Sequence, residues 1–152
     1  MRTHVLFVGH CEDEAGSAFM RTTSHLLGDR AHFRTNMPPE EMAGAFRCAD
    51  VFAHAALREP FGIVLIEALA CGLPVVGHRF AVTEWIVSDG GICIDMTQPG
   101  MLEDVLRAWL LDSTLRRSIG ARARRRAESV FSPAAVAPLY AQLVRDIVGG
   151  AS

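Results

Sequence analysis

The sequence contains no lysine, since all fifteen of its lysine and arginine positions are arginines. A P-loop NTPase needs a lysine on the nucleotide phosphates, and a pyridoxal-phosphate enzyme needs one for its Schiff base, so both classes are excluded. The four cysteines lie far apart and form no CxxC pair, which argues against a thiol redox motif and a closed zinc site. We expect reduced and mostly buried thiols instead.

Long hydrophobic runs are also missing. The uncharged stretch 68–78 is interrupted by Gly72, Pro74 and Gly77 and falls far short of the roughly 20 apolar residues of a membrane span. Only four strongly apolar residues, 5–8, follow the start of the chain, too few for a secretory h-region of about 7–15. We therefore expect a cytoplasmic protein.

The composition is that of a globular protein. Half of the residues are apolar, 21% are charged, and the formal net charge is −2, which excludes disorder as the main state. A chain of 152 residues fits one ordinary domain with one hydrophobic core.

Six of the arginines gather late in the chain. We interpret them as the solvated face of a helix, because apolar residues recur at four-residue spacing on the other side. Nucleic-acid binding is the less favoured interpretation, because the net charge is slightly acidic and no aromatics interleave the run; peripheral contact with an anionic membrane is a further alternative. The arginines are Arg116, Arg117, Arg122, Arg124, Arg125 and Arg126, and the apolar residues are Leu115, Ile119, Ala123 and Ala127.

The histidines and tryptophans suggest no site by their spacing. The six histidines form no HxxxH or HxH pattern, so we expect no metal site. His78 follows a predicted strand and could line a cleft, although a plain loop histidine is the simpler interpretation. Trp85 and Trp109 fall on predicted helices, where we expect core residues.

Short apolar runs alternate with helical stretches along the first two thirds of the chain. This alternation predicts right-handed βαβ units, and hence an α/β fold with a parallel sheet covered by helices on both faces. Ligands of such sheets bind at the carboxyl ends of the strands. The predicted strands are 4–8, 32–34, 50–55, 74–77 and 91–95, the helices are 16–27, 38–48, 60–71 and 83–88, and 98–148 is helical with breaks near 112–113 and 132–133.

The start of helix 60–71 predicts an anion site. Pro60 suits the first helical position, so the amides of Phe61, Gly62 and Ile63 fall in the first turn, where they lack partners and the helix dipole is positive. Gly62 would let a ligand approach the backbone closely.

Two carboxylates flank these amides. Glu67 lies about two turns into a helix that is apolar on nearly every side, and a buried carboxylate needs a partner or a polar ligand. Glu59 precedes the helix, so both carboxylates can face one cleft and suit a ligand with hydroxyls at its ends and phosphate between. Alternatively, Glu59 caps the helix and Glu67 pairs with a core arginine or hydroxyl.

The segments 59–62 (EPFG) and 67–76 (EALACGLPVV) resemble the signature of retaining GT-B glycosyltransferases of family four, the glycosyl transferases group 1. Three further segments resemble the same family: 5–9, 49–52 (ADVF) and 84–91. The resemblance covers nearly the entire chain and implies a Rossmann-like nucleotide-sugar-binding domain over 1–152. This domain is half of a GT-B fold and is N-terminally incomplete relative to the family.

The resemblance also implies roles for individual residues. Glu59 would be catalytic, touching the donor sugar's hydroxyls and supporting charge at the reacting carbon, and Glu67 would hold the ribose hydroxyls. The amides at Phe61, Gly62 and Ile63 would meet the sugar and the diphosphate. The nucleobase would lie near Arg34 and Thr35.

The implied reaction moves a hexose from a UDP- or GDP-sugar to a hydroxyl acceptor, with retention and without a metal or other cofactor. Its partner would be the N-terminal acceptor domain or a partner chain, without which we expect this chain to be inactive alone. The final helix, by resemblance, would cross back toward that domain, and its apolar side is alternatively a surface for homodimerisation.

The chain departs from the family pattern at several places. The arginine and lysine that hold the diphosphate in the family lie earlier than this sequence begins. Ala55 and Ala56 stand where the family has Pro-Ser, residues 81–83 replace its glycines, and Pro133 replaces an aromatic.

Two other functions fit the sequence. One is a non-catalytic Rossmann-like domain that binds a nucleotide or a partner and lacks turnover. The other is a flavodoxin-like signalling module, which would need a lysine and aspartates at strand ends, and only 11–14 (CEDE) resembles the latter.

Overall fold

A computed structural model describes residues 2–149 of the chain. These residues divide into two compact units, 2–42 and 43–149. Met1 and residues 150–152, which the predicted domain includes, lie outside the described residues.

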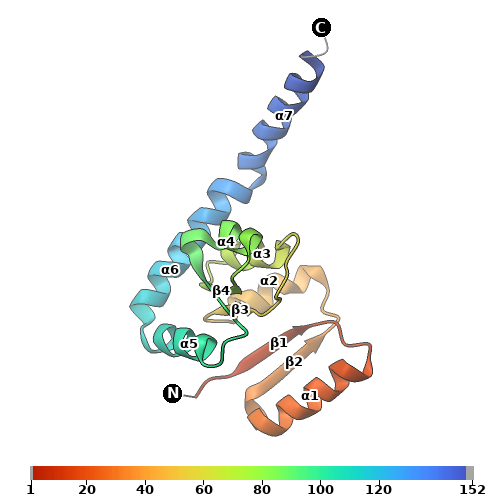
Figure 1. The fold of residues 1–152 in the computed structure, drawn as a ribbon, viewed down its shortest axis with the longest axis vertical. Coiled ribbons are helices and arrows are strands. Elements are labelled where there is room, and N and C mark those ends of the chain that lie inside the picture. The colour runs from red at the N-terminus through yellow and green to blue at the C-terminus, as the bar shows by residue number, and fades with distance from the viewer. Residues whose placement is uncertain (1, 150–152) are drawn as a thin grey trace. The chain divides into compact units, whose positions relative to one another are not determined.

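The first unit is a βαβ unit (Figure 1). Strand β1 (Val5–Gly9) and strand β2 (Ala31–Thr35) pair in parallel, with Val5 opposite Ala31 and Gly9 opposite Thr35. Helix α1 (Glu14–Leu27) and the 3-10 turn η1 (Gly28–Arg30) connect them. The Asp13 carboxylate caps α1 by accepting a hydrogen bond from the Gly16 amide at 2.7 Å, which satisfies one of the free amides of the first turn.

The predicted cover on both faces of the sheet is not found at strand β1. The burial pattern of its five residues contains three exposed positions, which include Leu6 and Val8. Its Phe7 stacks on Phe33 of β2 and meets Phe19 of α1 edge-on, both with ring centroids about 5 Å apart. Only one face of this strand is therefore packed.

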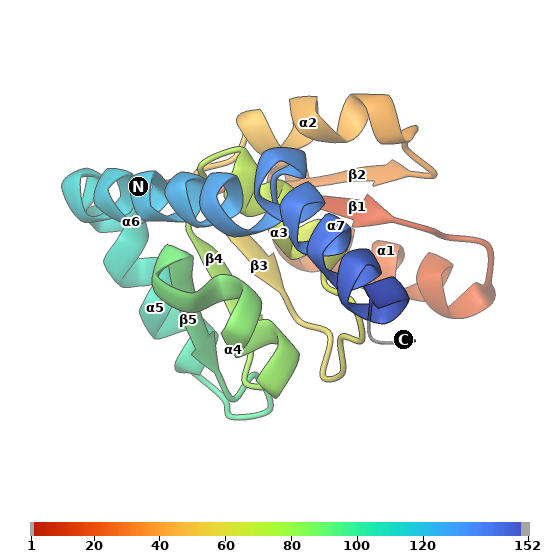
Figure 2. The same ribbon diagram turned by 90° about the horizontal axis from the view of Figure 1, so that it is seen from above.

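Helix α2 (Pro39–Arg47) leads from the first unit into the second. The second unit contains a three-stranded parallel sheet in the order β3 (Phe52–His54), β4 (Val75–His78), β5 (Gly91–Ile94) (Figure 2). Consecutive strand residues point to opposite faces, and Val75 and Val76 are both completely buried. The central strand is therefore covered on both faces, as the sequence predicts.

Helices follow each strand of this sheet. Helix α3 (Ile63–Ala70) follows β3, and helix α4 (Ala81–Val87) with the turn η2 (Ser88–Gly90) follows β4. After β5 the chain is helical, as α5 (Met101–Leu111), α6 (Ser113–Arg126), a π-helical turn η3 (Ala127–Phe131) and α7 (Pro133–Gly149). The predicted α/β class, its parallel strand pairing and the helical C-terminal segment are confirmed. The strands pair within each unit, as β1–β2 in the first and as β3–β4–β5 in the second.

The α6 arginines do more than form a solvated face. Ile119, Ala123 and Ala127 are buried on the opposite side, as predicted, whereas Leu115 is exposed. Four of the arginines donate hydrogen bonds to backbone carbonyls at the ends of other elements, so only part of the predicted solvated face is correct. The acceptors are Trp109 and Leu110 for Arg116, Asp89 for Arg122, Ala70 for Arg124, and Trp85 and Ile86 for Arg126.

The two tryptophans differ in burial. Trp109 is 7% exposed and belongs to the core, as predicted, but Trp85 is 59% exposed. Trp85 instead packs edge-on against Phe131 and lies beneath the Arg126 guanidinium, 5.6 Å from the ring centroid. Its ring completes a surface cluster rather than the core.

The cysteines are free but less buried than the sequence predicts. Cys48 lies in the turn after α2 and is exposed, and Cys11, Cys71 and Cys93 are half-buried. Burial, with the nearby Glu84 charge as a smaller cause, raises the pKa of the Cys93 thiol to about 11, so this thiol stays protonated at neutral pH.

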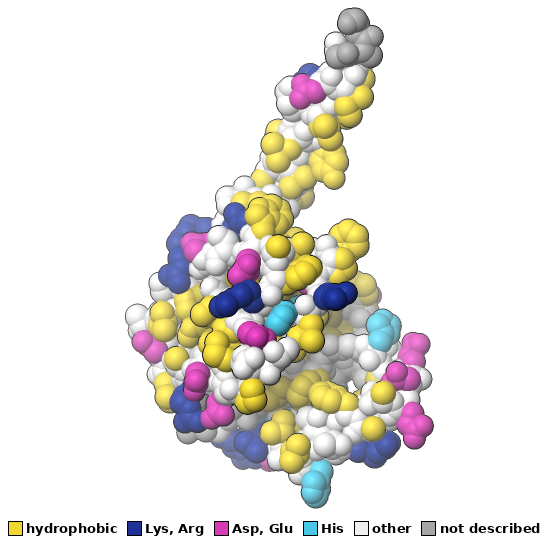
Figure 3. All heavy atoms as spheres, viewed as in Figure 1, with side chains coloured by type: hydrophobic (Ala, Val, Ile, Leu, Met, Phe, Trp, Pro, Cys, Tyr) yellow, Lys and Arg dark blue, Asp and Glu magenta, His cyan; other side chains and the backbone are white. Residues whose placement is uncertain are grey.

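Helix α7 extends away from the rest of its unit (Figure 1). None of its described residues is buried, and its apolar side chains form much of its surface (Figure 3). Among residues 2–149, no helix combines the length and the apolar character needed to span a bilayer.

Candidate functional site

The candidate site lies at the carboxyl edge of the β3–β4–β5 sheet. In the parallel register His54 is opposite Gly77, and His78 is opposite Ile94. The strands therefore end at the same edge, where the loop between β3 and α3 carries Glu59. This is the edge at which α/β proteins bind ligands.

The Glu59 carboxylate is held by three hydrogen-bond donors. Its Oε1 accepts hydrogen bonds from the amides of Gly62 at 2.8 Å and Phe61 at 3.2 Å. Its Oε2 lies 2.9 Å from Nε2 of His54, and the side chain is only 17% exposed. The carboxylate is thus fixed at both oxygens in a largely enclosed position.

These contacts favour the ionised form of Glu59. The Gly62 amide, then His54 and the Phe61 amide, hold the pKa of the carboxyl below its ordinary value. An ionised carboxylate accepts hydrogen bonds and donates none. At neutral pH Glu59 can therefore accept a hydrogen bond from a ligand hydroxyl or stabilise positive charge, but it cannot serve as a proton donor.

The predicted free-amide site is not formed as expected. Helix α3 begins at Ile63, three residues after Pro60, because Gly62 adopts a left-handed conformation with φ of 64° and acts as the N-cap. A left-handed residue interrupts helical geometry, so Phe61 and Gly62 stand before the helix. Their amides donate to Glu59 rather than remaining without partners.

Gly62 is required by packing as well as by conformation. A Cβ at this position would stand 2.4 Å from Cδ1 of Ile86. The core residue Ile86 fills the place of the missing side chain, and the predicted approach of a ligand to the Gly62 backbone stays a prediction.

Glu67 is exposed rather than buried. Helix α3 buries Leu65, Ala68 and Leu69, while Ile63 and Glu67 lie four residues apart on an exposed face. The carboxylate therefore needs no buried partner, and it lies about one turn into the helix rather than two. Its predicted contact with ribose stays a prediction.

Arg34 and Thr35 lie at the carboxyl end of β2, in the first unit. Both are exposed, and the Arg34 guanidinium donates to the Phe33 carbonyl at 3.3 Å. The residues predicted for the sugar, the diphosphate and the ribose all belong to the second unit. The nucleobase contact stays a prediction.

A polar pocket follows the ends of β4 and β5. It has a volume of about 370 Å³ and is lined by His78, Arg79, Asp95 and Thr97. Nδ1 of His78 accepts a hydrogen bond from the Met96 amide at 3.2 Å. Hydrogen bonds from the Thr97 hydroxyl and amide lower the pKa of the Asp95 carboxyl. Of the two interpretations of His78, the structure therefore favours the one in which it lines a pocket.

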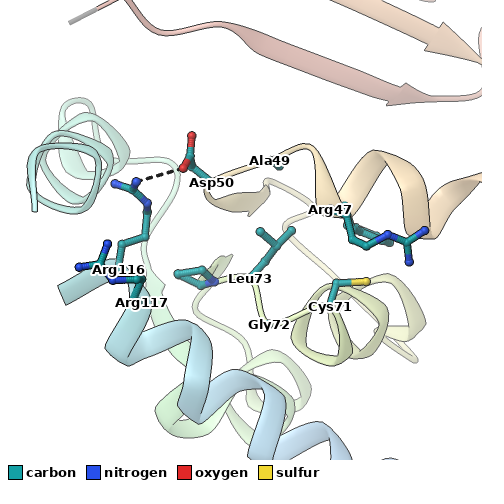
Figure 4. Close-up of a pocket in the computed structure, with 10 residues that line it drawn as sticks. Arg47, Ala49, Asp50, Cys71, Gly72, Leu73, Arg116 and Arg117 are labelled. Atoms are coloured by element: carbon teal, nitrogen blue, oxygen red, sulfur yellow. Dashed lines mark ion pairs between the residues drawn. The ribbon is translucent and has the colours of Figure 1, made fainter. Parts of the chain in front are cut away.

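A second pocket, of about 240 Å³, lies at the opposite ends of β3 and β4 (Figure 4). Its Arg116 points toward Asp50 just before β3, with 3.0 Å between the nitrogen and oxygen atoms. Because Arg116 also donates to carbonyls of α5, we regard this ion pair as structural.

His54 is the site residue that the sequence analysis missed. Its ring stands at the last position of β3 and contacts a carboxylate five residues later. The only available signal was its place at the carboxyl end of a predicted strand, since no metal-type spacing includes it. Among residues 2–149, no group of three His, Cys, Asp or Glu side chains is placed to hold a metal ion.

Comparison with known proteins gives consistent matches. The family described as "Glycosyl transferases group 1" matches residues 2–126. The D-inositol 3-phosphate glycosyltransferase of Corynebacterium diphtheriae is 34% identical over 129 residues, which cover 76% of this chain and 30% of the relative. Curated relatives that carry this same name are matched over only 22% to 32% of their own length.

Solved structures match almost the whole chain. Sucrose-phosphate synthase from Thermosynechococcus elongatus has a TM-score of 0.83 and 27% identity, over 95% of this chain and 38% of that one. HepE of Anabaena in complex with UDP-glucose has a TM-score of 0.81 and 21% identity, over 94% of this chain and 41% of that one. In both cases the chain corresponds to part of a larger protein.

Proposed function

Since the chain belongs to the glycosyl transferases group 1 family and matches the C-terminal part of GT-B glycosyltransferases, we propose that it is the nucleotide-sugar-binding domain of a retaining glycosyltransferase. The domain would span residues 1–152. The enzyme would move a hexose from a UDP- or GDP-sugar to a hydroxyl acceptor, with an acceptor-binding domain or a partner chain supplying the other half of the cleft. A cytoplasmic location stays a prediction.

One observation carries this proposal: the enclosed and ionised carboxylate of Glu59 at the carboxyl edge of the sheet. Its lowered pKa makes it an acceptor for a donor-sugar hydroxyl and a source of negative charge beside the reacting carbon. The UDP-glucose complex of HepE, a protein of the same fold, supports a UDP-sugar as the donor.

Residues of other elements would contact the other parts of the donor. Glu67, on the exposed face of α3, would accept the ribose hydroxyls, and Ile63 would offer an amide in the first helical turn. Both amides donate to Glu59 in this structure. Phe61 and Gly62 would therefore bind the donor only if their amides break these hydrogen bonds and donate to the donor instead. Arg34 and Thr35 remain the proposed nucleobase contacts.

Calorimetric titration of UDP, GDP and ADP into the full chain tests the donor site. We expect one nucleotide to bind, and Glu67→Ala to weaken it about 10- to 100-fold, the usual value of a hydrogen bond to a charged group. Glu103→Ala is the matched control, because Glu103 is an exposed carboxylate that pairs with Arg107 on α5.

Two other results would contradict the proposal. If none of the three nucleotides binds, the non-catalytic binding domain becomes the leading interpretation. If Glu67→Ala and Glu103→Ala weaken binding equally, Glu67 is not the ribose ligand. Whatever the binding result, turnover is measured in a separate assay with an acceptor-binding domain present.

A further inference from the structure

We propose that His54 is a positioning residue, which fixes the Glu59 carboxylate in the orientation that receives a hydroxyl of the donor sugar. The inference rests on the proposed role of Glu59 and adds to it a residue outside the EPFG segment. It follows from how the two oxygens of the carboxylate are held.

The two oxygens have different partners. Oε1 accepts from two amides of the loop that follows Glu59 itself, at Phe61 and Gly62. Oε2 meets a side chain from a different element, His54 at the end of β3, at 2.9 Å. The first set of contacts lies within the loop, whereas the His54 contact joins the carboxylate to the end of the sheet.

His54 itself is held by packing. Phe52 and His54 are two residues apart, so they project from the same side of β3, and their rings stack at 18° with centroids 6.1 Å apart. Phe52 in turn meets the buried Phe46 edge-on at 5.4 Å. The imidazole is 24% exposed, and its packing against the Phe52 ring restricts its rotation.

Removal of the His54 ring would loosen the carboxylate. The terminal torsion of a glutamate is broad, and rotation about it moves both oxygens, so the contact at Oε2 adds to the two amides at Oε1 in fixing the plane of the group. A carboxylate offers about four lone-pair sites, of which the three observed contacts use three. With His54 in place, the remaining site has a defined direction, and a sugar hydroxyl can use it.

The test measures the contribution of the sugar to binding separately from that of the nucleotide. UDP and UDP-glucose are titrated into the full chain, and the ratio of their dissociation constants measures what the sugar contributes to binding. In His54→Ala we expect the affinity for UDP to stay within about threefold, while the sugar's contribution falls about tenfold, as for loss of an oriented charged hydrogen bond.

Three variants show whether His54 acts through Glu59. His54→Gln keeps an N–H donor near the position of Nε2, so it should restore most of the sugar's contribution. Glu59→Gln should lose that contribution, and the double variant His54→Ala/Glu59→Gln should lose no more than Glu59→Gln alone. His25→Ala, at an exposed position of α1, is the control and should behave as the unmodified chain.

The outcomes distinguish this inference from the proposed function. Binding of UDP-glucose that His54→Ala leaves unchanged overturns the inference and leaves the donor site intact. Equal weakening of UDP and UDP-glucose in His54→Ala also overturns it, because His54 would then support the site as a whole. An unmodified chain that binds neither UDP and UDP-glucose nor GDP and GDP-glucose contradicts the donor site itself, and the positioning role falls with it.

Discussion

Gly62 is the residue at which backbone conformation and packing impose the same requirement. Gly62 is the last residue of the loop and has a left-handed conformation with φ of 64°, and α3 begins at the next residue. Ile86 fills the space beside its Cα. The position of the Phe61 and Gly62 amides, and through them of the Glu59 carboxylate, therefore depends on the absence of a side chain here.

Gly62→Ala should lower the free energy of unfolding by about 2–5 kcal/mol, the sum of the left-handed backbone penalty and the overpacking against Ile86. Gly72→Ala is the matched control. Gly72 has φ of 75° at the other end of α3, but its nearest neighbour is 3.7 Å from an added Cβ, so only the backbone penalty of about 1–2 kcal/mol applies. Urea unfolding of both variants measures the difference, and equal losses would show that the Ile86 contact relaxes freely.

Helix α6 joins three other helices through its arginines. The carbonyls of a last helical turn lack intrahelical partners and carry partial negative charge. Arg124, Arg126 and Arg116 donate to carbonyls at the ends of α3, α4 and α5 respectively. The arginine-rich run, which could suggest an anionic partner, thus stabilises the arrangement of helices around the second sheet.

Arg116→Met should lower the free energy of unfolding by about 1–3 kcal/mol, because it removes hydrogen bonds to two carbonyls and leaves Asp50 without its partner. Methionine keeps most of the apolar stem of the arginine, so the loss reports the guanidinium. Arg125→Met, at an exposed position of the same helix, should change stability by less than about 0.5 kcal/mol. Similar losses in both variants would contradict the capping role of Arg116.

At the scale of the whole molecule, helix α7 buries none of its described side chains. Its large apolar side chains recur every three or four residues, which places them along one broad stripe. An exposed apolar stripe of this kind marks a surface that associates with another surface. The exposed residues are Leu139, Tyr140, Leu143, Val144, Ile147 and Val148, each 53–71% accessible.

Sedimentation velocity should show the isolated chain associating as its concentration rises, in line with the predicted homodimerisation surface. Leu143→Glu/Ile147→Glu should shift the chain toward the monomer with little effect on stability, because neither residue is buried. Gln142→Glu/Arg145→Gln changes the net charge by the same −2 and serves as the control, since both residues are polar. Equal dissociation by the two pairs would point to charge rather than to the apolar stripe.

Local sequence patterns determined which elements exist. The alternation of apolar runs and helical stretches predicted all five strands and their connecting helices, because residue periodicity and the residues that stop an element act over a few positions. Gly72 shows this well. It follows α3 in the left-handed conformation, and the Leu73 amide closes the helix by donating to the Ala68 carbonyl at 3.1 Å.

Tertiary packing decided which face of each element is buried and which side chains meet. The apolar sequence of α3 predicted a buried Glu67, yet only the stripe through Leu65, Ala68 and Leu69 has neighbours that cover it. His54 and Glu59 are only five residues apart, but they meet through the folded path of the β3–α3 loop, which no periodic pattern specifies. Composition and motif thus placed the chain in its family, whereas the burial of each face was decided by distant segments, whose positions no local pattern specifies.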